Sequence, residues 1–574
     1  MIRRFVLLLM FALPCLGGTV TGTVTANGAL LPGADVTLSQ NEARRSTTTD
    51  VDGHFAFLGV PSGTWKVRAE LSGLTPAEQT VAVTETNTIS LNLTMHTMVT
   101  ETITVTAMAP AVLTTTAVAT AMMSYSGETY TPIVENKFIA AAKQHLSTFS
   151  IDVDTASYSM VRRTIGEGKL PDRDEVRIEE MVNYFTYSYP EPSGAQPFSV
   201  TTEVAGAPWA PEHRLLRIGI RGTQLAPWQM KPCNLVFLLD TSGSMDDPLR
   251  LPLLKKAFRM LAEQLRAEDR VAIVVYAGSA GLVLPSTSGA DKSRIYDALE
   301  ALDAGGSTAG GEGIELAYAV AKQNFIVDGV NRVILATDGD FYVGVSDEEE
   351  LQKLIEEKRK DDIELSVIGV GEGNRKDATM ELLADKGNGN YSYVDSLLEA
   401  RKVFVDQIGG TLVTIAKDVK LQLDFDPQQV ASYRLVGYET RLLADKDFED
   451  DAKDAGELGS GHTVTALYEI VPAPGASHGA IATLKLRYKL PHGHFSRLMS
   501  VNVIDSGKSA WEASDDLKFA ASVAETGMLL RDSPHKGKAT WDDALQLAKT
   551  SRGADLEGYR AGFVKLVEQA RGLK

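Results

Sequence analysis

The chain has 574 residues, with 57 lysines and arginines against 75 aspartates and glutamates, which gives a formal net charge of −18. So acidic a chain is not expected to bind nucleic acid or an anionic membrane surface through non-specific charge. Domains usually hold ~100–200 residues, so the length predicts about three to five of them. A hydrophobic content of 44% is enough to give each domain a core.

The first 18 residues are typical of a secretory signal. Arg3 and Arg4 precede an apolar run over residues 5–13, and small residues follow it at Gly17 and Gly18. The apolar run is too short to span a bilayer, and no later stretch predicts a transmembrane helix. We therefore expect the protein to be exported, and to be periplasmic or associated with the cell envelope.

The two cysteines raise separate questions. A lipid anchor would use a cysteine directly after the apolar run, so Cys15 keeps that option open, but Leu13 and Pro14 fit such a site poorly and we do not favour it. If Cys15 leaves with the signal, Cys233 is the only cysteine left and cannot form an intrachain disulfide. We expect Cys233 to be a packed residue.

Residues 19–96 predict a small all-β module, because polar and apolar residues alternate between Asn-Gly, Pro-Gly and Asp-Gly turn signals. This pattern resembles the carboxypeptidase-regulatory-like, transthyretin-type β-sandwich of many secreted bacterial proteins. Asp50 and Asp52 lie at one of the turns, where turn formation explains them better than calcium binding. Residues 97–135 are rich in threonine, alanine, valine and methionine, have few charges, and predict a linker.

Residues 136–230 form a region with a predicted helix at 177–185, followed by two predicted strands within 198–221. Asp152 and Asp154 alternate, so on a strand they would share one face. A metal-binding role for this pair is open. With no further ligands nearby in sequence, we favour a solvated or helix-capping role.

Residues 231–410 alternate between short apolar runs and amphipathic stretches. The predicted strands are 234–240, 270–277, 331–337, 363–370 and 391–395, and the predicted helices are 249–266, 291–302, 309–325, 347–359, 376–386 and 397–409. This alternation predicts a doubly wound, Rossmann-like α/β domain, with a parallel sheet covered by helices on both faces. Ligands of such sheets bind at the carboxyl ends of the strands.

Three polar side chains stand at the end of the first of these strands or just after it, at Asp240, Ser242 and Ser244. One carboxylate and two hydroxyls are hard ligands that suit Mg²⁺, Mn²⁺ or Ca²⁺. They are too few to fill the coordination shell, so a bound ion would keep room for an outside oxygen. Thr308 in a glycine-rich loop and Asp338 at the end of strand 331–337 would extend the set.

These segments, in this order, resemble the metal-ion-dependent adhesion site (MIDAS) of von Willebrand factor A domains. In that family the aspartate and both serines of the first motif contact the ion, as does the threonine of the second, and the aspartate of the third usually acts through water. The resemblance assigns these roles to Asp240, Ser242, Ser244, Thr308 and Asp338. The alternative is that these residues only cap helices and form turns.

The resemblance also implies a way for the site to act. In the family, a divalent ion, here Mg²⁺ or else Mn²⁺ or Ca²⁺, captures an acidic side chain of a partner protein. Movement of the loop that carries Thr308 can couple this event to the last helix, predicted here at 397–409.

Residues 411–510 return to β patterns, with strands that we expect to pair with those of 198–221, so that the A domain is inserted into a β-sandwich. The acidic run 445–454 fails as a calcium loop, because Asp450 stands where a glycine is needed, and is expected to be a solvated, mobile loop. His492 and His494 are expected at the surface, and residues 511–574 are helical. From 136 to 574 the chain resembles a family of bacterial secreted von Willebrand factor A proteins.

Motifs for catalysis are missing from the sequence. It has no HExxH, GxSxG or Walker-type motif, and no histidine lies between His213 and His462 to activate Ser242 or Ser244. We therefore expect no enzyme but a metal-dependent protein–protein binding module for adhesion or scaffolding in the bacterial envelope.

Two alternatives stay open. A metal-assisted hydrolase would need a further acid or base near the ion, for which the nearest residues in sequence are Asp246, Asp247, Glu312 and Asp340. A structural envelope protein would use the ion for stability alone.

Overall fold

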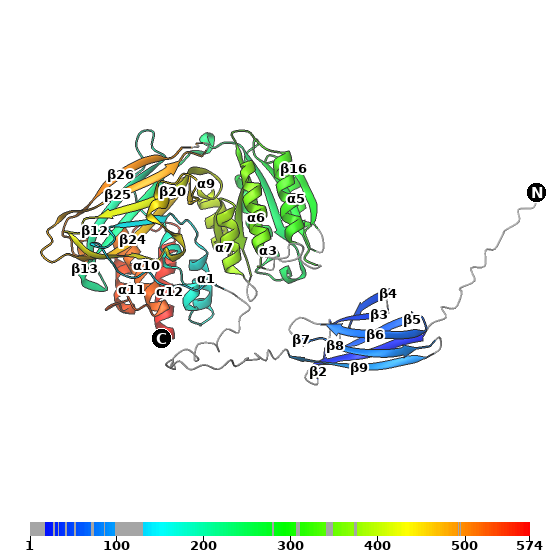
Figure 1. The fold of residues 1–574 in the computed structure, drawn as a ribbon. Coiled ribbons are helices and arrows are strands. Elements are labelled where there is room, and N and C mark those ends of the chain that lie inside the picture. The colour runs from blue at the N-terminus through cyan, green and yellow to red at the C-terminus, as the bar shows by residue number, and fades with distance from the viewer. Residues whose placement is uncertain are drawn as a thin grey trace, which may run out of the picture. The chain divides into compact units, whose positions relative to one another are not determined.

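The computed structural model describes most of the chain (Figure 1). The described residues are 18–26, 29–31, 34–40, 43–50, 53–70, 74–84, 87–97, 130–277, 280–305, 310–339, 348–371, 376–491, 493 and 495–574. The predictions for the signal segment with Cys15, for most of the linker, and for Asp52, Thr308, Asp340, His492 and His494 therefore lie outside the described residues. The chain divides into two compact units, Met1–Ala119 and Thr120–Lys574, and each is described by itself.

The first unit is a sandwich of two β-sheets. One sheet has the order β2-β1-β9-β7, with β5 also paired to β1, and the other has the order β4-β3-β6-β8. The strands are β1 (Gly18–Ala26), β2 (Ala29–Leu30), β3 (Asp35–Gln40), β4 (Ala43–Thr48), β5 (His54–Val60), β6 (Gly63–Glu70), β7 (Leu74–Thr75), β8 (Ala77–Val83) and β9 (Thr88–Thr97). Alternate residues of both sheets, such as Val20 and Trp65, meet in one core. Asp50 accepts a hydrogen bond from the backbone N–H of His54 at 2.8 Å, which is a turn-forming role.

The A domain of the second unit has a six-stranded sheet in the order β16-β15-β14-β17-β18-β19. The strands are β14 (Cys233–Asp240), β15 (Arg270–Tyr276), β16 (Ala280–Ser288), β17 (Val330–Thr337), β18 (Glu364–Gly369) and β19 (Tyr391–Tyr393). All neighbours are parallel except β16, which pairs antiparallel with β15 at the sheet edge. The sequence analysis missed β16 because Pro285 interrupts its pattern, although an edge strand tolerates a proline.

Helices cover both faces of this sheet. They are α3 (Leu251–Gln264), α4 (Lys292–Glu300), α5 (Gly310–Gln323), α6 (Glu348–Lys358), α7 (Asp377–Lys386), α8 (Leu397–Arg401) and α9 (Ile408–Leu412). Leu235 and Phe237 of β14 pack with α3 on one face, whereas Val236 and Leu238 pack with α5 on the other. The central strand is therefore apolar at every position before Asp240 except Asn234. The last predicted helix is not continuous, because a π-helical turn (Lys402–Asp406) separates α8 from α9.

A β-sandwich, which we call the frame, carries the A domain. Its sheets have the orders β10-β21-β24-β13-β12 and β22-β11-β20-β25-β26, with β23 on β20. The strands are β10 (Ile139–Ala140), β11 (Leu146–Ser150), β12 (Phe198–Ala207), β13 (Ala210–Gly222), β20 (Thr414–Phe425), β21 (Val430–Val436), β22 (Leu442–Leu443), β23 (Gly456–Gly459), β24 (Thr463–Pro472), β25 (Gly479–Lys489) and β26 (Arg497–Asp505). Strand β13, before the A domain, pairs with β24, after it, as expected for an inserted domain.

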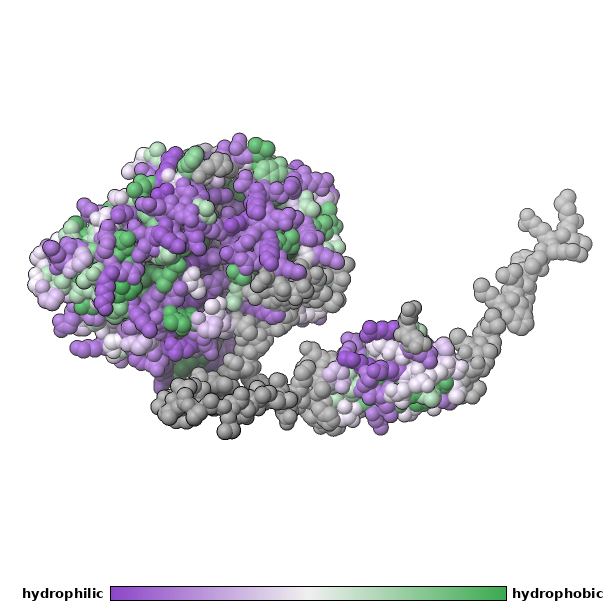
Figure 2. All heavy atoms as spheres, viewed as in Figure 1, coloured by the Kyte–Doolittle hydropathy of each residue, from purple (hydrophilic) through white to green (hydrophobic). Residues whose placement is uncertain are grey.

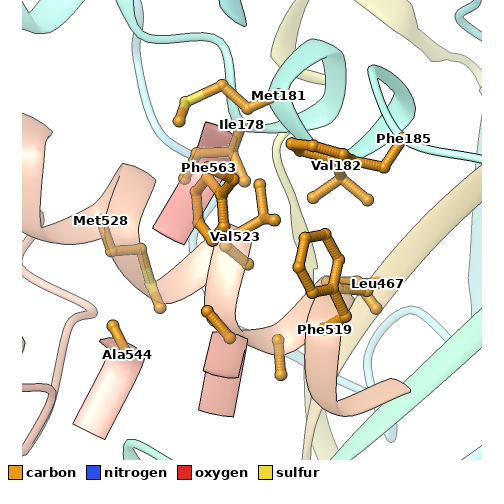
Figure 3. Packing of buried hydrophobic residues seen from close by; sticks show 14 of the residues in the cluster. Ile178, Met181, Val182, Phe185, Leu467, Phe519, Val523, Met528, Ala544 and Phe563 are labelled. Carbon is orange, nitrogen blue, oxygen red and sulfur yellow. The ribbon is translucent and has the colours of Figure 1, made fainter. Parts of the chain in front are cut away.

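Five helices pack against the frame in one further core. They are α1 (Ala156–Gly166), α2 (Ile178–Asn183), α10 (Asp515–Arg531), α11 (Trp541–Thr550) and α12 (Tyr559–Leu573). Figure 3 shows Phe185, Phe519 and Phe563 converging there, with ring centroids of Phe185 and Phe519 5.0 Å apart. Regions 136–230 and 511–574, which are distant in sequence, thus share a core.

Short helical turns complete the second unit. They are η1 (Arg173–Glu175), η2 (Pro227–Gln229), η3 (Gly243–Met245), η4 (Arg359–Asp361), η6 (Glu439–Arg441), η7 (Asp445–Phe448) and η8 (Ala510–Glu512). Hydrophilic residues dominate the face of this unit seen in Figure 2, and the apolar patches on it are small and scattered. Within the described ranges, every helix is too short or too polar to cross a membrane.

The alternating aspartates after β11 correct a sequence prediction. The side chains of Asp152 and Asp154 are buried, so the expectation of a solvated pair is wrong, although Asp152 Oδ1 accepts the backbone N–H of Asp154 at 3.1 Å, as a capping residue does. Arg441 donates to Asp152 Oδ1 at 3.2 Å and to Asp154 Oδ2 at 2.9 Å. The two carboxylates hold a buried arginine that lies far away in sequence, which no local pattern can show.

Those groups belong to a larger set of buried charges between the frame and α7 of the A domain, which we call the ionic junction. It consists of Arg177 and Arg441 with Asp152, Asp154, Glu180 and Asp377, and Arg441 also pairs with the exposed Asp385 at its rim. Arg177 donates to Asp377 Oδ2 at 2.7 Å and also pairs with Glu180. These contacts tie the inserted domain to its carrier.

Two further expectations concern Cys233 and the acidic run. Cys233 is buried, as expected for a packed residue. Its burial raises the pKa of its thiol to about 12. The acidic run 445–454 is largely exposed, as expected of a solvated loop, but its contacts do not fit a mobile one. Asp445 accepts from Thr148 at 2.8 Å, Asp454 pairs with Arg359 at 2.6 Å, and Phe448 is buried. These long-range contacts fix the segment against the sheet.

Candidate metal centre

Asp240 is the last residue of the central strand β14, and its side chain is buried. Its Oδ1 accepts the backbone N–H of Ser242 at 2.9 Å. Its Oδ2 accepts the hydroxyls of Tyr276, at 3.2 Å, and Thr337, at 3.1 Å. These two residues end the neighbouring strands β15 and β17, so the order of the sheet fixes the orientation of the carboxylate.

Burial raises the pKa of the Asp240 carboxyl to about 6, and the negative charge of Asp338 adds to this effect. Hydrogen bonds from Ser242 and Thr337 act in the opposite direction, because they stabilise the charged form. A carboxylate removed from water in this way is stabilised further by a nearby cation.

The two serines lie on the turn η3 that follows β14. Their hydroxyl oxygens are 3.0 Å apart. Ser242 stands at the N-cap position of η3, yet its side chain makes no capping hydrogen bond there. Met245 is buried and anchors the turn, whereas Ser244 is exposed. The hydroxyls therefore sit beside Asp240 at the boundary with solvent, and Ser242 does not do what the capping alternative requires.

Asp338 follows β17 and is buried. Its Oδ2 forms an ion pair with Nη1 of Arg250. Its Oδ1 is also buried, and no described residue donates a hydrogen bond to it. An unpartnered buried carboxylate oxygen is rare, and such an atom calls for a water or an ion.

Arg250 is the residue that sequence reasoning missed. Besides Asp338, it donates to the backbone carbonyl oxygen of Ser244 at 2.6 Å. It also lies against Gly371, whose φ is +73°; a Cβ at Gly371 would be 2.3 Å from Arg250 Nε. Nothing in the sequence marks Arg250. Tyr276 and Thr337 could have been found, because they end predicted strands that flank β14.

The other described acidic residues near the motif are not buried. Asp246, Asp247 and Glu312 are exposed. Asp247 accepts the backbone N–H of Leu249 at 2.8 Å, which is a turn contact. The part of the chain described here brings Asp240, Ser242, Ser244 and Asp338 together, while Thr308, the fifth predicted ligand, lies outside it.

The donor set fits a hard divalent cation. It offers a buried carboxylate, two adjacent hydroxyls and the unpartnered Oδ1 of Asp338, all of them oxygens of the kind that Mg²⁺ and Mn²⁺ prefer. The described residues contain no group of three or more histidine, cysteine, aspartate or glutamate side chains placed to hold a metal ion. A cation here would therefore depend on the serine hydroxyls.

The fold and this arrangement of side chains define a von Willebrand factor A domain protein. Residues 234–406 match the family described as von Willebrand factor type A domain, and residues 124–217 match one described as von Willebrand factor. Residues 19–96 match the carboxypeptidase regulatory-like domain, and residues 410–573 match the family described as uncharacterized protein YfbK, C-terminal. Domains of the A type suggest a role in protein–protein interaction.

The chain belongs to the family of the Escherichia coli protein YfbK. The two are 40% identical over 469 residues, which cover 77% of this chain and 81% of that protein. The protein sll0103 of Synechocystis is 30% identical over 200 residues, covering 35% of this chain and 46% of its own length. A solved structure, von Willebrand factor type A from Catenulispora acidiphila, is 16% identical with a TM-score of 0.38, covering 66% of this chain and 91% of that one.

Proposed function

We propose that this chain is a metal-dependent protein-binding module for adhesion or scaffolding in the bacterial envelope. Asp240, Ser242, Ser244 and Thr308 would hold Mg²⁺, or else Mn²⁺ or Ca²⁺, and Asp338 would act through a water. The observation that carries the proposal is that a buried Asp240, two adjacent hydroxyls and an oxygen of Asp338 to which no described residue donates meet at the carboxyl end of the sheet.

The chain's own residues give each part of the site its task. Ser242 N–H, Tyr276 and Thr337 orient the Asp240 carboxylate. The serine hydroxyls are neutral, so they offer oxygen atoms without cancelling the charge of a cation. A divalent ion bound there would act as a Lewis acid towards one oxygen from outside the chain. An acidic side chain of the partner would provide that oxygen.

The setting favours binding over catalysis. In the described residues, the hydroxyl of Ser242 contacts the hydroxyl of Ser244 at 3.0 Å and the carboxylate of Asp240, which in this proposal is a metal ligand rather than a general base. Of the four acidic residues named for a hydrolase, the three that the structure describes, Asp246, Asp247 and Glu312, are exposed rather than buried beside the serines. The signal-like start of the chain and the carboxypeptidase regulatory-like domain support export to the envelope.

The test is calorimetric titration of the full chain with Mg²⁺, beside Asp240→Ala and the control Asp246→Ala. Wild type and the control are expected to bind the ion, and Asp240→Ala is expected to lose it. Circular dichroism checks that each variant is folded. A folded wild type that binds none of Mg²⁺, Mn²⁺ and Ca²⁺ would refute the proposal.

The remaining alternatives predict different results with the same protein. A hydrolase would cleave generic phosphoester, ester or peptide substrates in a reaction that EDTA stops. An ion that serves stability alone would raise the unfolding temperature without increasing the affinity for any acidic peptide.

A further inference from the structure

Arg250 joins three loops at the carboxyl edge of the A-domain sheet. It stands directly before α3 and reaches the loop after β14 through the carbonyl oxygen of Ser244, 2.6 Å away. It reaches the loop after β17 through its ion pair with Asp338. It also lies against Gly371, which stands in the loop that begins with Val370 after strand β18. One guanidinium thus links the loops that follow β14, β17 and β18.

The ion pair treats the two oxygens of Asp338 differently. Oδ2 is neutralised by Arg250, whereas Oδ1 stays buried without a donor among the described residues. An aspartate that is already paired with a cation attracts a second cation less strongly. Arg250 thereby favours a contact between Asp338 and the ion through a water molecule over direct ligation. Because Asp338 is paired with Arg250, its carboxylate cannot by itself offset the charge of the ion.

A charge count shows what this means for the loaded site. Asp240 and Asp338 carry −2 together, and Arg250 brings the sum to −1. A divalent cation would make it +1, whereas the same site without Arg250 would be neutral. A net positive site at the surface attracts an anionic group, and a neutral one does not.

We propose that Arg250 is a specificity-determining residue of the metal centre, which lowers the affinity for the cation and thereby selects a carboxylate as the outside ligand. This inference rests on the proposed function. The side chain of Arg250 is only 15% exposed and held by three loops, so its charge stays in place when a partner arrives.

A purely structural role would have a different signature. If Arg250 only holds the loops together, its removal loosens Ser244 and Asp338 and weakens cation binding. If its charge matters, its removal strengthens cation binding and weakens anion binding. The two roles thus predict opposite signs for the same measurement.

The experiment is calorimetric titration of Mg²⁺ into the full chain as wild type, Arg250→Met, Arg250→Lys and the control Arg259→Met. Arg259 lies on α3, the helix that Arg250 precedes, and it pairs with Glu263 at 3.7 Å. Arg250→Met is expected to bind Mg²⁺ roughly tenfold more tightly, because a positive charge close to the ion is gone. Arg250→Lys keeps the charge and is expected to stay close to wild type, as is Arg259→Met.

The second measurement uses Mn²⁺ as the probe and acetate as the carboxylate. Acetate that displaces water from bound Mn²⁺ lowers the water-proton relaxation rate. We expect Arg250→Met to need several times more acetate than wild type for the same decrease. Unchanged or weaker Mg²⁺ binding by folded Arg250→Met, or unchanged acetate dependence, would overturn the inference alone. If wild type binds no ion, the proposed function falls as well.

Discussion

Two of the places where the described residues bury carboxylates, the ionic junction and the candidate metal centre, provide them with partners in opposite ways. In the ionic junction, Asp152 and Asp154 share Arg441, and Asp377 and Glu180 share Arg177. At the candidate metal centre, the described residues give Asp240 neutral hydroxyl and amide donors, and they give Asp338 one arginine for one of its oxygens. The difference teaches that burial of a carboxylate does not by itself indicate a ligand site. A better indication is a buried carboxylate that lacks a charged partner and lies where the strand ends meet solvent.

The largest effect is expected from breaking the junction. Arg441→Met leaves Asp152 and Asp154 buried without a counter-charge, and removal of one partner of a buried ion pair typically lowers the free energy of unfolding by about 3–5 kcal/mol. Guanidinium denaturation of the full chain, followed by circular dichroism, measures this. Adding Asp152→Asn and Asp154→Asn should recover most of the loss. A triple variant as unstable as Arg441→Met would show that packing, not charge, explains the effect.

The candidate metal centre should instead stabilise the folded protein when a divalent ion is added. A ligand that binds only the folded state at a hundred times its Kd stabilises that state by about 2.7 kcal/mol. Saturating Mg²⁺ is therefore expected to raise the Tm of wild type and to leave that of Asp240→Ala unchanged, as differential scanning calorimetry can measure. Equal shifts in both proteins would place the ion elsewhere.

Glu525 of α10 tests the comparison with a buried carboxylate outside both regions. Burial raises its pKa from 4.5 to about 8, and Asp543 adds to the shift. The folded state therefore favours the neutral form. Its contribution to stability is complete below pH 4.5 and is lost as the pH rises towards 8.

Glu525→Gln should accordingly be more stable than wild type at pH 8, by an amount on the order of a few kcal/mol, and the two should converge near pH 5. Thermal unfolding across this pH range provides the measurement. A variant that runs parallel to wild type at every pH would contradict the assigned shift.

The smallest effect is expected for an exposed pair. Asp451 contacts Arg487 at 3.2 Å, with both side chains at least a quarter exposed. Pairs in contact with water contribute about 0–1 kcal/mol, and salt screens them. Asp451→Ala should therefore change the midpoint of denaturation only slightly at physiological salt. A loss as large as that of Arg441→Met would remove the contrast between buried and exposed charge.

The sequence predicted the parts of the molecule whose information is local. Continuous apolar runs identified the strands around β14, and the spacing of Asp240, Ser242 and Ser244 identified the loop that follows it. Asp152 and Asp154 were misinterpreted because Arg441, their partner, is brought close only by the folded frame. Arg250 escaped notice for the same reason, since its contacts with Asp338 and Gly371 join loops that are separate in sequence. Periodicity shows which face of an element is buried, but not which distant charge meets it.

The most direct test of the account is a crystal of the full chain grown with Mn²⁺ and measured for anomalous scattering. We predict one peak bounded by the Asp240 carboxylate and the hydroxyls of Ser242 and Ser244, with at least one coordination position open to solvent or filled by a carboxylate. Well-ordered loops with no peak at this edge, or a peak with a shell completed by the chain's own side chains, would contradict the claim that this centre captures a partner.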